Sequence, residues 1–216
     1  MTPLLKKSIT SFVSITLCTL SIFIIAEPAI ISAVTDDVVV NLTVDSGIAI
    51  TSPTDVTLGS SNMGVSVNSA IGTAVWNVKT NDPDGYLLTI KNASTSPALK
   101  GAGGIGNFAD YTEAVANTPE LWAVDASTYQ FGYSVRGTDV NTGTYGSGAD
   151  CGTGNTPSGT LKYRHASTTA ITAATRSSTT TTAGIDTTAC FAAGQNGVYA
   201  AAGSYSATIT ATATTL

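Results

Sequence analysis

Apolar and polar residues alternate with a period of two along much of this chain, and this pattern predicts half-buried strands. The alternation is clearest in residues 73–91, where two stretches flank the turn sequence Asn81-Asp82-Pro83-Asp84-Gly85. Pro83 presets a turn dihedral and Gly85 can adopt positive φ, so we expect a β-hairpin here. The faces expected to point into the core carry Ala74, Trp76, Val78, Tyr86, Leu88 and Ile90.

Further strand-like segments are short and are separated by turn residues, whereas helix signals are almost absent. These segments are residues 38–44, 48–51, 56–58, 65–67, 121–124, 130–136, 161–165 and 204–214. The last one has one apolar face, and the Ser/Thr run at 177–182 fits a loop or an extended edge. The fold class predicted is all-β, a two-sheet antiparallel β-sandwich with long loops around 92–120 and 141–160.

The N-terminus has the layout of a secretory signal peptide. Lys6 and Lys7 precede an apolar run, residues 9–26, and Glu27 is the next charged residue. Small residues suit the cleavage site, so we expect cleavage after Ala33, with Ala26 as a second possible end. Because apolar character resumes at residues 29–34, an uncleaved membrane anchor is the alternative. The predicted organisation is residues 1–33 as signal peptide or anchor and residues 34–216 as a single domain.

The composition of residues 34–216 fits an exported domain that does not bind nucleic acid. These 183 residues are enough for one sandwich-sized core. Removal of Lys6, Lys7 and Glu27 leaves seven basic and thirteen acidic residues, a net charge of −6, which disfavours binding to phosphate backbones. Charged residues make up only 11% of the whole chain, and Thr, Ser, Ala and Gly replace them. Thr favours strands because its branched Cβ suits a pleated surface.

Two cysteines remain after the signal, since Cys18 lies in the apolar run. We expect Cys151 and Cys190 to form a disulfide, because export brings them into an oxidising compartment. Two free thiols in a reducing setting are the alternative. With His165 as the only histidine, these residues cannot make a zinc site of the usual four-ligand type.

Candidate chemistry is sparse, and we predict no catalytic, cofactor or metal site and therefore no enzyme. His165 lacks a Gly-x-Ser-x-Gly elbow elsewhere in the chain. The acids Asp110, Glu113 and Glu120 could form a glycosidase pair only if the fold brought two of them together, so exposed loop acids are expected. Asp82 and Asp84 resemble the start of a calcium loop without its later ligands, which favours a tight turn.

Two further features resemble binding motifs. Residues 101–106 have Gly-x-Gly-like spacing, but no helix signal follows, so a surface loop is expected instead of a nucleotide site. Trp122, Tyr129 and Tyr133 could stack on sugar rings if exposed. Core packing is the stronger expectation for a domain with few aromatic residues.

Four sequence blocks carry a resemblance to known families. They are Asn41-Leu-Thr-Val, Trp76-Asn-Val-Lys-Thr, Asp84-Gly-Tyr-Leu-Leu-Thr-Ile and Tyr205-Ser-Ala-Thr-Ile-Thr-Ala-Thr. Together they resemble uncharacterised exported β-sandwich proteins of bacteria and, more distantly, WxL-type surface proteins. The latter resemblance is partial, since Val78 stands where that family has Leu and the last block lacks its second Trp. It implies noncovalent attachment to a bacterial cell wall.

These observations predict a non-catalytic structural or interaction protein of a bacterial envelope, located at the cell surface or outside the cell. Its expected partners are an envelope component or neighbouring copies of itself, with no nucleic acid, and with membrane contact only through an uncleaved N-terminal segment. One alternative is a filament subunit, because the β-prone residues 38–44 could complete a neighbour's sheet. A carbohydrate-binding module is the other alternative.

Overall fold

The computed structural model describes residues 38–59 and 61–216. The predicted signal peptide lies outside the described residues. The chain divides into two units, Met1–Thr43 and Val44–Leu216, and the strands given below belong to the second unit. Within the described residues, no helix has the length and apolar character that crossing a membrane requires.

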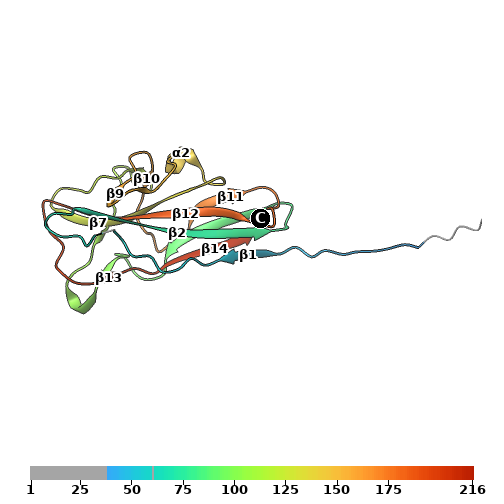
Figure 1. Ribbon diagram of the computed structural model, residues 1–216, viewed down its shortest axis with the longest axis horizontal. Coiled ribbons are helices and arrows are strands. Elements are labelled where there is room, and N and C mark those ends of the chain that lie inside the picture. The colour runs from blue at the N-terminus through green and yellow to red at the C-terminus, as the bar shows by residue number, and fades with distance from the viewer. Residues whose placement is uncertain (1–37, 60) are drawn as a thin grey trace, which may run out of the picture. The chain divides into compact units, whose positions relative to one another are not determined.

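Val44–Leu216 folds as a β-sandwich, which confirms the predicted all-β class. The larger sheet contains, in spatial order, β1 (Ile48–Thr51), β2 (Ser69–Thr80), β12 (Ile185–Asn196), β7 (Thr128–Gly137) and β5 (Ala109–Asp110). The smaller sheet contains β11 (Ile171–Arg176), β3 (Tyr86–Asn92) and β14 (Ile209–Thr215). Neighbouring strands are antiparallel except for β5, which runs parallel to β7. The long strands β2 and β12 lie side by side through the middle of the domain (Figure 1).

The remaining elements are short and lie mostly in the two regions predicted as long loops. Residues 92–120 contain β4 (Lys100–Gly101), the 3₁₀ helix η1 (Ala102–Gly104), β5 and the start of β6 (Glu120–Leu121). Residues 141–160 contain α2 (Thr142–Tyr145), β8 (Gly152–Thr153) and β9 (Thr156–Pro157). Two further strands, β10 (Lys162–Tyr163) and β13 (Tyr205–Ser206), pair with β6 and β4 respectively.

The predicted faces of β2 and β3 are confirmed, but the predicted hairpin between them is wrong. The two strands belong to different sheets. Their apolar faces, represented by Trp76 and Leu88, are both buried in the core between the sheets. The turn is present as expected, with the Gly85 N–H donating to the Asp82 carbonyl at 3.1 Å and Gly85 at φ 88°. Each strand has one apolar face, and crossing to the opposite sheet brings these faces together, which a hairpin in one sheet cannot do.

Several expected strands are irregular, and two of the longer strands, β11 and β12, were not predicted. Residues 38–44 and 56–58 have no strand, residues 65–67 contribute only a single bridge, and only Leu121 of residues 121–124 belongs to a strand. Strands β11 and β12 carry no clear period-two signal in the sequence. Nearly all of β12 is buried because both of its faces are covered, so its buried residues form a continuous run without alternation.

A second, smaller cluster covers the outer face of the larger sheet. It contains Tyr111, Cys151, Leu161, Tyr163, Cys190 and Ala192. The indole of Trp122 packs against this cluster, directly over Gly132 and Gly194. A Cβ on Gly194 would lie 2.5 Å from Val124 Cγ2 and 3.2 Å from the Trp122 ring. Glycine at this position therefore makes room for the side chains that cap the sheet.

Candidate functional site

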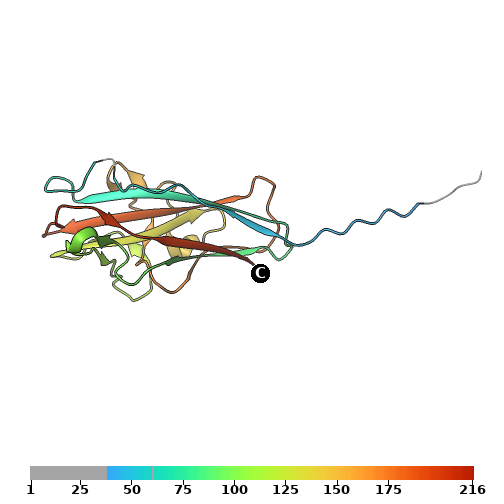
Figure 2. The same ribbon diagram turned by 90° about the horizontal axis from the view of Figure 1, so that it is seen from below.

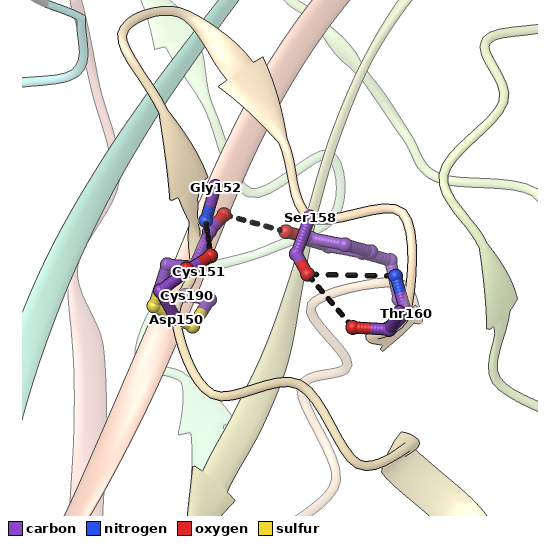
Figure 3. Close-up of a disulfide and its surroundings, with 7 residues drawn as sticks. Asp150, Cys151, Gly152, Ser158, Thr160 and Cys190 are labelled. Atoms are coloured by element: carbon purple, nitrogen blue, oxygen red, sulfur yellow. Dashed lines mark hydrogen bonds between the residues drawn. A yellow bond between two sulfur atoms is a disulfide. The ribbon is translucent and has the colours of Figure 1, made fainter.

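Cys151 and Cys190 form the predicted disulfide. Cys190 lies in β12, and Cys151 belongs to the loop that covers the outer face of the larger sheet, with 5.2 Å between the two Cα atoms (Figure 3). The Cys151 carbonyl accepts hydrogen bonds from the Ser158 N–H at 3.0 Å and the Tyr163 hydroxyl at 3.3 Å. The disulfide closes a sequence separation of 39 residues, which restricts the unfolded chain by about 4 kcal/mol in the loop-entropy model.

The candidate catalytic residues meet in one pair that the sequence did not predict. Glu113 is buried, with 8% of its surface exposed, so the expectation of an exposed loop acid is wrong for this residue. Its carboxylate accepts a hydrogen bond from the His165 backbone N–H at 3.0 Å and lies 2.8 Å from His165 Nδ1. Among the hydrogen bonds of the described residues, none joins the His165 ring to a Ser, Thr or Cys side chain. The contacts between Glu113 and His165 hold the segment around residue 113 against the segment that follows β10.

The other acidic candidates serve local structure. Asp110 accepts hydrogen bonds from the Ser96 hydroxyl and from the Ala98 N–H at 2.8 Å, whereas Glu120 accepts one from the Ala114 N–H. Asp82 accepts from the Ser46 hydroxyl at 2.6 Å and the Asp84 N–H at 2.9 Å, and these two hydrogen bonds hold the pKa of its carboxyl below the usual range. Across residues 38–59 and 61–216, no three His, Cys, Asp or Glu side chains gather in an arrangement that could hold a metal.

The three aromatic candidates are packed to different depths, since Tyr133 is buried whereas Trp122 and Tyr129 are half-buried. Tyr133 is fully buried in the core. Trp122 stacks on Tyr111 with ring centroids 4.8 Å apart, and Tyr129 meets Phe108 edge to face at 5.1 Å.

The two lateral sides of the sandwich differ in how they are covered. The side between β7 and β11, which we name the closed margin, is covered by the segment that contains residues 138–145. The Thr175 N–H of β11 donates to the Asp139 carbonyl at 3.1 Å, and the Tyr145 hydroxyl donates to the Thr172 carbonyl at 2.9 Å. Val140 and Tyr145 are buried in the core, so this segment covers the core at that side.

The opposite side, between β1 and β14, is covered only in part, and we name it the open margin. The two strands lie close together at this side (Figure 2, blue and dark red). Their apolar residues pack against the core but are only half-buried, unlike Leu88 and Ile90 of the neighbouring strand β3. These half-buried residues are Ile48, Ile50, Ile209, Ala211 and Ala213. Among the described strands, β14 pairs with β3 alone, so its outer edge has no ladder partner.

Residues 38–44 are an exposed apolar segment. Val38, Val40, Leu42 and Val44 occupy alternate positions, and Leu42 has 86% of its surface exposed. No ladder partner for this segment exists in the part of the chain that the structure describes. A strand needs a neighbour for its backbone groups, which explains why high β-propensity alone gave no strand here.

The fold and these features define an all-β sandwich domain with one disulfide, one side covered by the chain's own residues 138–145 and one side covered only in part. Comparison of this chain with protein-family models, with curated proteins and with solved structures found no match.

Proposed function

We propose that this protein is an exported, non-catalytic structural component of a bacterial envelope that joins neighbouring copies of itself by strand addition. One observation carries the proposal. Residues 38–44 present alternating apolar side chains without a partner, and the open margin presents half-buried apolar residues beside a free strand edge.

The donor segment and the acceptor edge match in length and pattern. Residues 38–44 and β14 both contain seven residues. In an extended donor, Val38, Val40, Leu42 and Val44 would share one face, which would cover the half-buried residues of the open margin. The donor backbone would bond to the outer edge of β14, as in other cases of strand addition.

The residues that directly follow the donor segment are held to the domain by hydrogen bonds. The Asp45 carbonyl accepts a hydrogen bond from the Asn81 amide at 2.8 Å, and the Gly47 N–H donates to the Asn81 side chain at 2.6 Å. The Ser46 hydroxyl donates to Asp82 at 2.6 Å. Residues 45–47 are therefore held on the turn between β2 and β3.

Two further observations support the other parts of the proposal. The predicted signal peptide, the weakly charged Thr-rich strands and the disulfide suit a protein outside the cytoplasm. The pair of Glu113 and His165 has no third hydroxyl or thiol member among its described hydrogen bonds, so it favours a structural role. Cell fractionation tests export, and a solely cytoplasmic protein would refute it.

Electron microscopy and light scattering of the purified exported protein test assembly. We expect oligomers or filaments, which Val40→Asp and Leu42→Asp should abolish by placing charges on the donor's apolar face. Val39→Asp, on the opposite face, is the matched control and should still assemble. Monomers at every concentration, or normal assembly of the Leu42→Asp variant, would contradict the proposal.

The carbohydrate-binding alternative receives less support from the aromatic residues than the sequence suggested. Trp122, Tyr129 and Tyr133 are occupied in packing.

A further inference from the structure

The closed margin encloses a half-open cavity of about 740 Å³. It lies between β11 and the segment that contains residues 138–145, and Arg164 contributes to its lining. Its size falls in the range of small-molecule sites. The ladder between β11 and β3 shifts register between Thr172 and Ala174, so the strand is irregular where it lines the cavity. Such irregularities are common beside binding sites.

Arg164 is a buried cation without a carboxylate partner. Only 7% of its surface is exposed, and its Nε is buried with no hydrogen-bond partner among the described residues. The ion pairs of the described residues are His165 with Glu113 and Arg176 with Asp139, so neither includes Arg164. An unpaired buried charge is costly, which makes an anionic partner for Arg164 favourable.

Two tyrosines interact with Arg164. Burial raises the pKa of Tyr145, and the charge of Arg164 together with a hydrogen bond from its side chain opposes that rise. The charge of Arg164 has the same opposing effect on Tyr133, whose pKa burial also raises. The backbone of Arg164 is fixed, because it exchanges two hydrogen bonds of 2.9 Å with Tyr133 of β7.

Two acids near the cavity are each bound to another residue. Asp139 lines the cavity, but its carboxylate lies 3.3 Å from Arg176 and accepts a hydrogen bond from the Tyr86 hydroxyl at 2.8 Å. Glu113 acts on Tyr133 from a distance while it is bound to His165. Among the described residues, neither acid forms an ion pair with Arg164.

We propose that this cavity binds a small carboxylate-bearing ligand the size of a monosaccharide, such as a uronic acid, with its carboxylate on Arg164. A guanidinium presents paired N–H donors that match a carboxylate. The remaining lining is rich in hydroxyl and amide groups, including Thr138, Asn141, Thr144 and Thr172, which suit the hydroxyls of a sugar ring.

Calorimetric titration of the exported protein with galacturonate, galactose and inorganic phosphate tests this site. We expect galacturonate to bind and galactose to bind at least about tenfold more weakly, because the charged hydrogen bonds are lost. Arg164→Gln should weaken galacturonate binding by a similar factor. Arg136→Gln, outside the cavity lining, is the control and should bind normally.

A second variant covers the case in which Arg164→Gln does not fold. Thr144→Trp should fill the cavity from its partly exposed rim while leaving Arg164 in place, and it should abolish binding. Equal binding of galactose and galacturonate, preference for phosphate, unchanged binding in Thr144→Trp, or no binding of any probe would each overturn the proposal. These results are independent of assembly, which uses the opposite side of the sandwich.

Discussion

The closed and open margins of this sandwich differ in how the apolar core between the two sheets is covered. At the closed margin the chain supplies its own cover, since Tyr145 is buried and bonds to the edge of β11. At the open margin the apolar residues of β1 and β14 stay half-buried and the edge of β14 is free. Natural sheets usually protect such edges from pairing with other chains. The free edge of β14, beside half-buried apolar residues, therefore indicates that another strand binds there.

The two margins should also differ in what they contribute to the stability of a single copy and to association between copies. Residues at the closed margin should contribute fully to the folding of a single copy, whereas residues at the open margin should contribute their full burial only in an assembly. Substitutions on the two sides should therefore have unequal effects on the monomer.

The largest effect is expected at the closed margin. Tyr145→Ala removes a side chain that is 2% exposed and should destabilise the monomer by about 3–5 kcal/mol. Chemical denaturation measures the change. Tyr199→Ala, at a position with 62% exposure, is the control and should change stability by less than about 0.5 kcal/mol. Similar losses in the two variants would show that the covering segment does not seal the core.

The disulfide should have the next largest effect, because it holds the loop that follows the closing segment. Cys151→Ala with Cys190→Ala should lower the free energy of unfolding by about 2–4 kcal/mol. Denaturation of the oxidised protein and of the double variant gives the difference. An unchanged midpoint would mean that packing alone fixes this loop on β12.

A smaller effect is expected at the open margin. Ile209→Ala should cost the monomer only about 1–2 kcal/mol because Ile209 is half-buried there. Leu88→Ala, in the same sheet but fully buried, is the comparison and should cost about 2–5 kcal/mol. If Ile209→Ala costs as much as Leu88→Ala in the monomer, the open margin is already closed.

The last predicted effect is electrostatic. It is absent at neutral pH and appears only in alkali. Burial raises the pKa of Tyr111 and of Tyr163 to about 12, whereas an unfolded tyrosine titrates near about 10. The unfolded chain loses these protons first, so their contribution is complete below pH ~10 and is lost as the pH rises through about 12. The urea midpoint of unfolding should fall as the pH rises between these two pKa values, and the Tyr111→Phe variant should show a smaller fall. A constant midpoint would contradict the burial of these hydroxyls.

The sequence predicted the parts of the fold that have one covered face. Strands β2, β3 and β14 alternate because one face of each packs inward, and the face assignment of Trp76 and Leu88 was correct. Strand β12 was missed because both of its faces are covered. The hairpin prediction failed because alternation fixes the buried face of a strand but does not fix the sheet to which the strand belongs.

The site features were predictable to different degrees. The pairing of Cys151 with Cys190 followed from the compartment and the cysteine count. The contact of Glu113 with His165 and the burial of Arg164 depend on loops that return to β7 from distant positions, and no local pattern marks them. The unpartnered state of residues 38–44 could not be predicted either, since a strand signal does not say where the neighbouring strand lies.

A mixing experiment tests the central claim most directly. A donor-deficient variant carries Val40→Asp and Leu42→Asp, and an acceptor-deficient variant carries Ala211→Arg and Ala213→Arg on β14. Circular dichroism first checks that both fold. Each variant alone should remain monomeric by light scattering, and the mixture should form dimers with one copy of each and nothing longer, because one donor and one acceptor remain. A mixture that stays monomeric, or assembly of either variant alone, would contradict strand addition at the open margin.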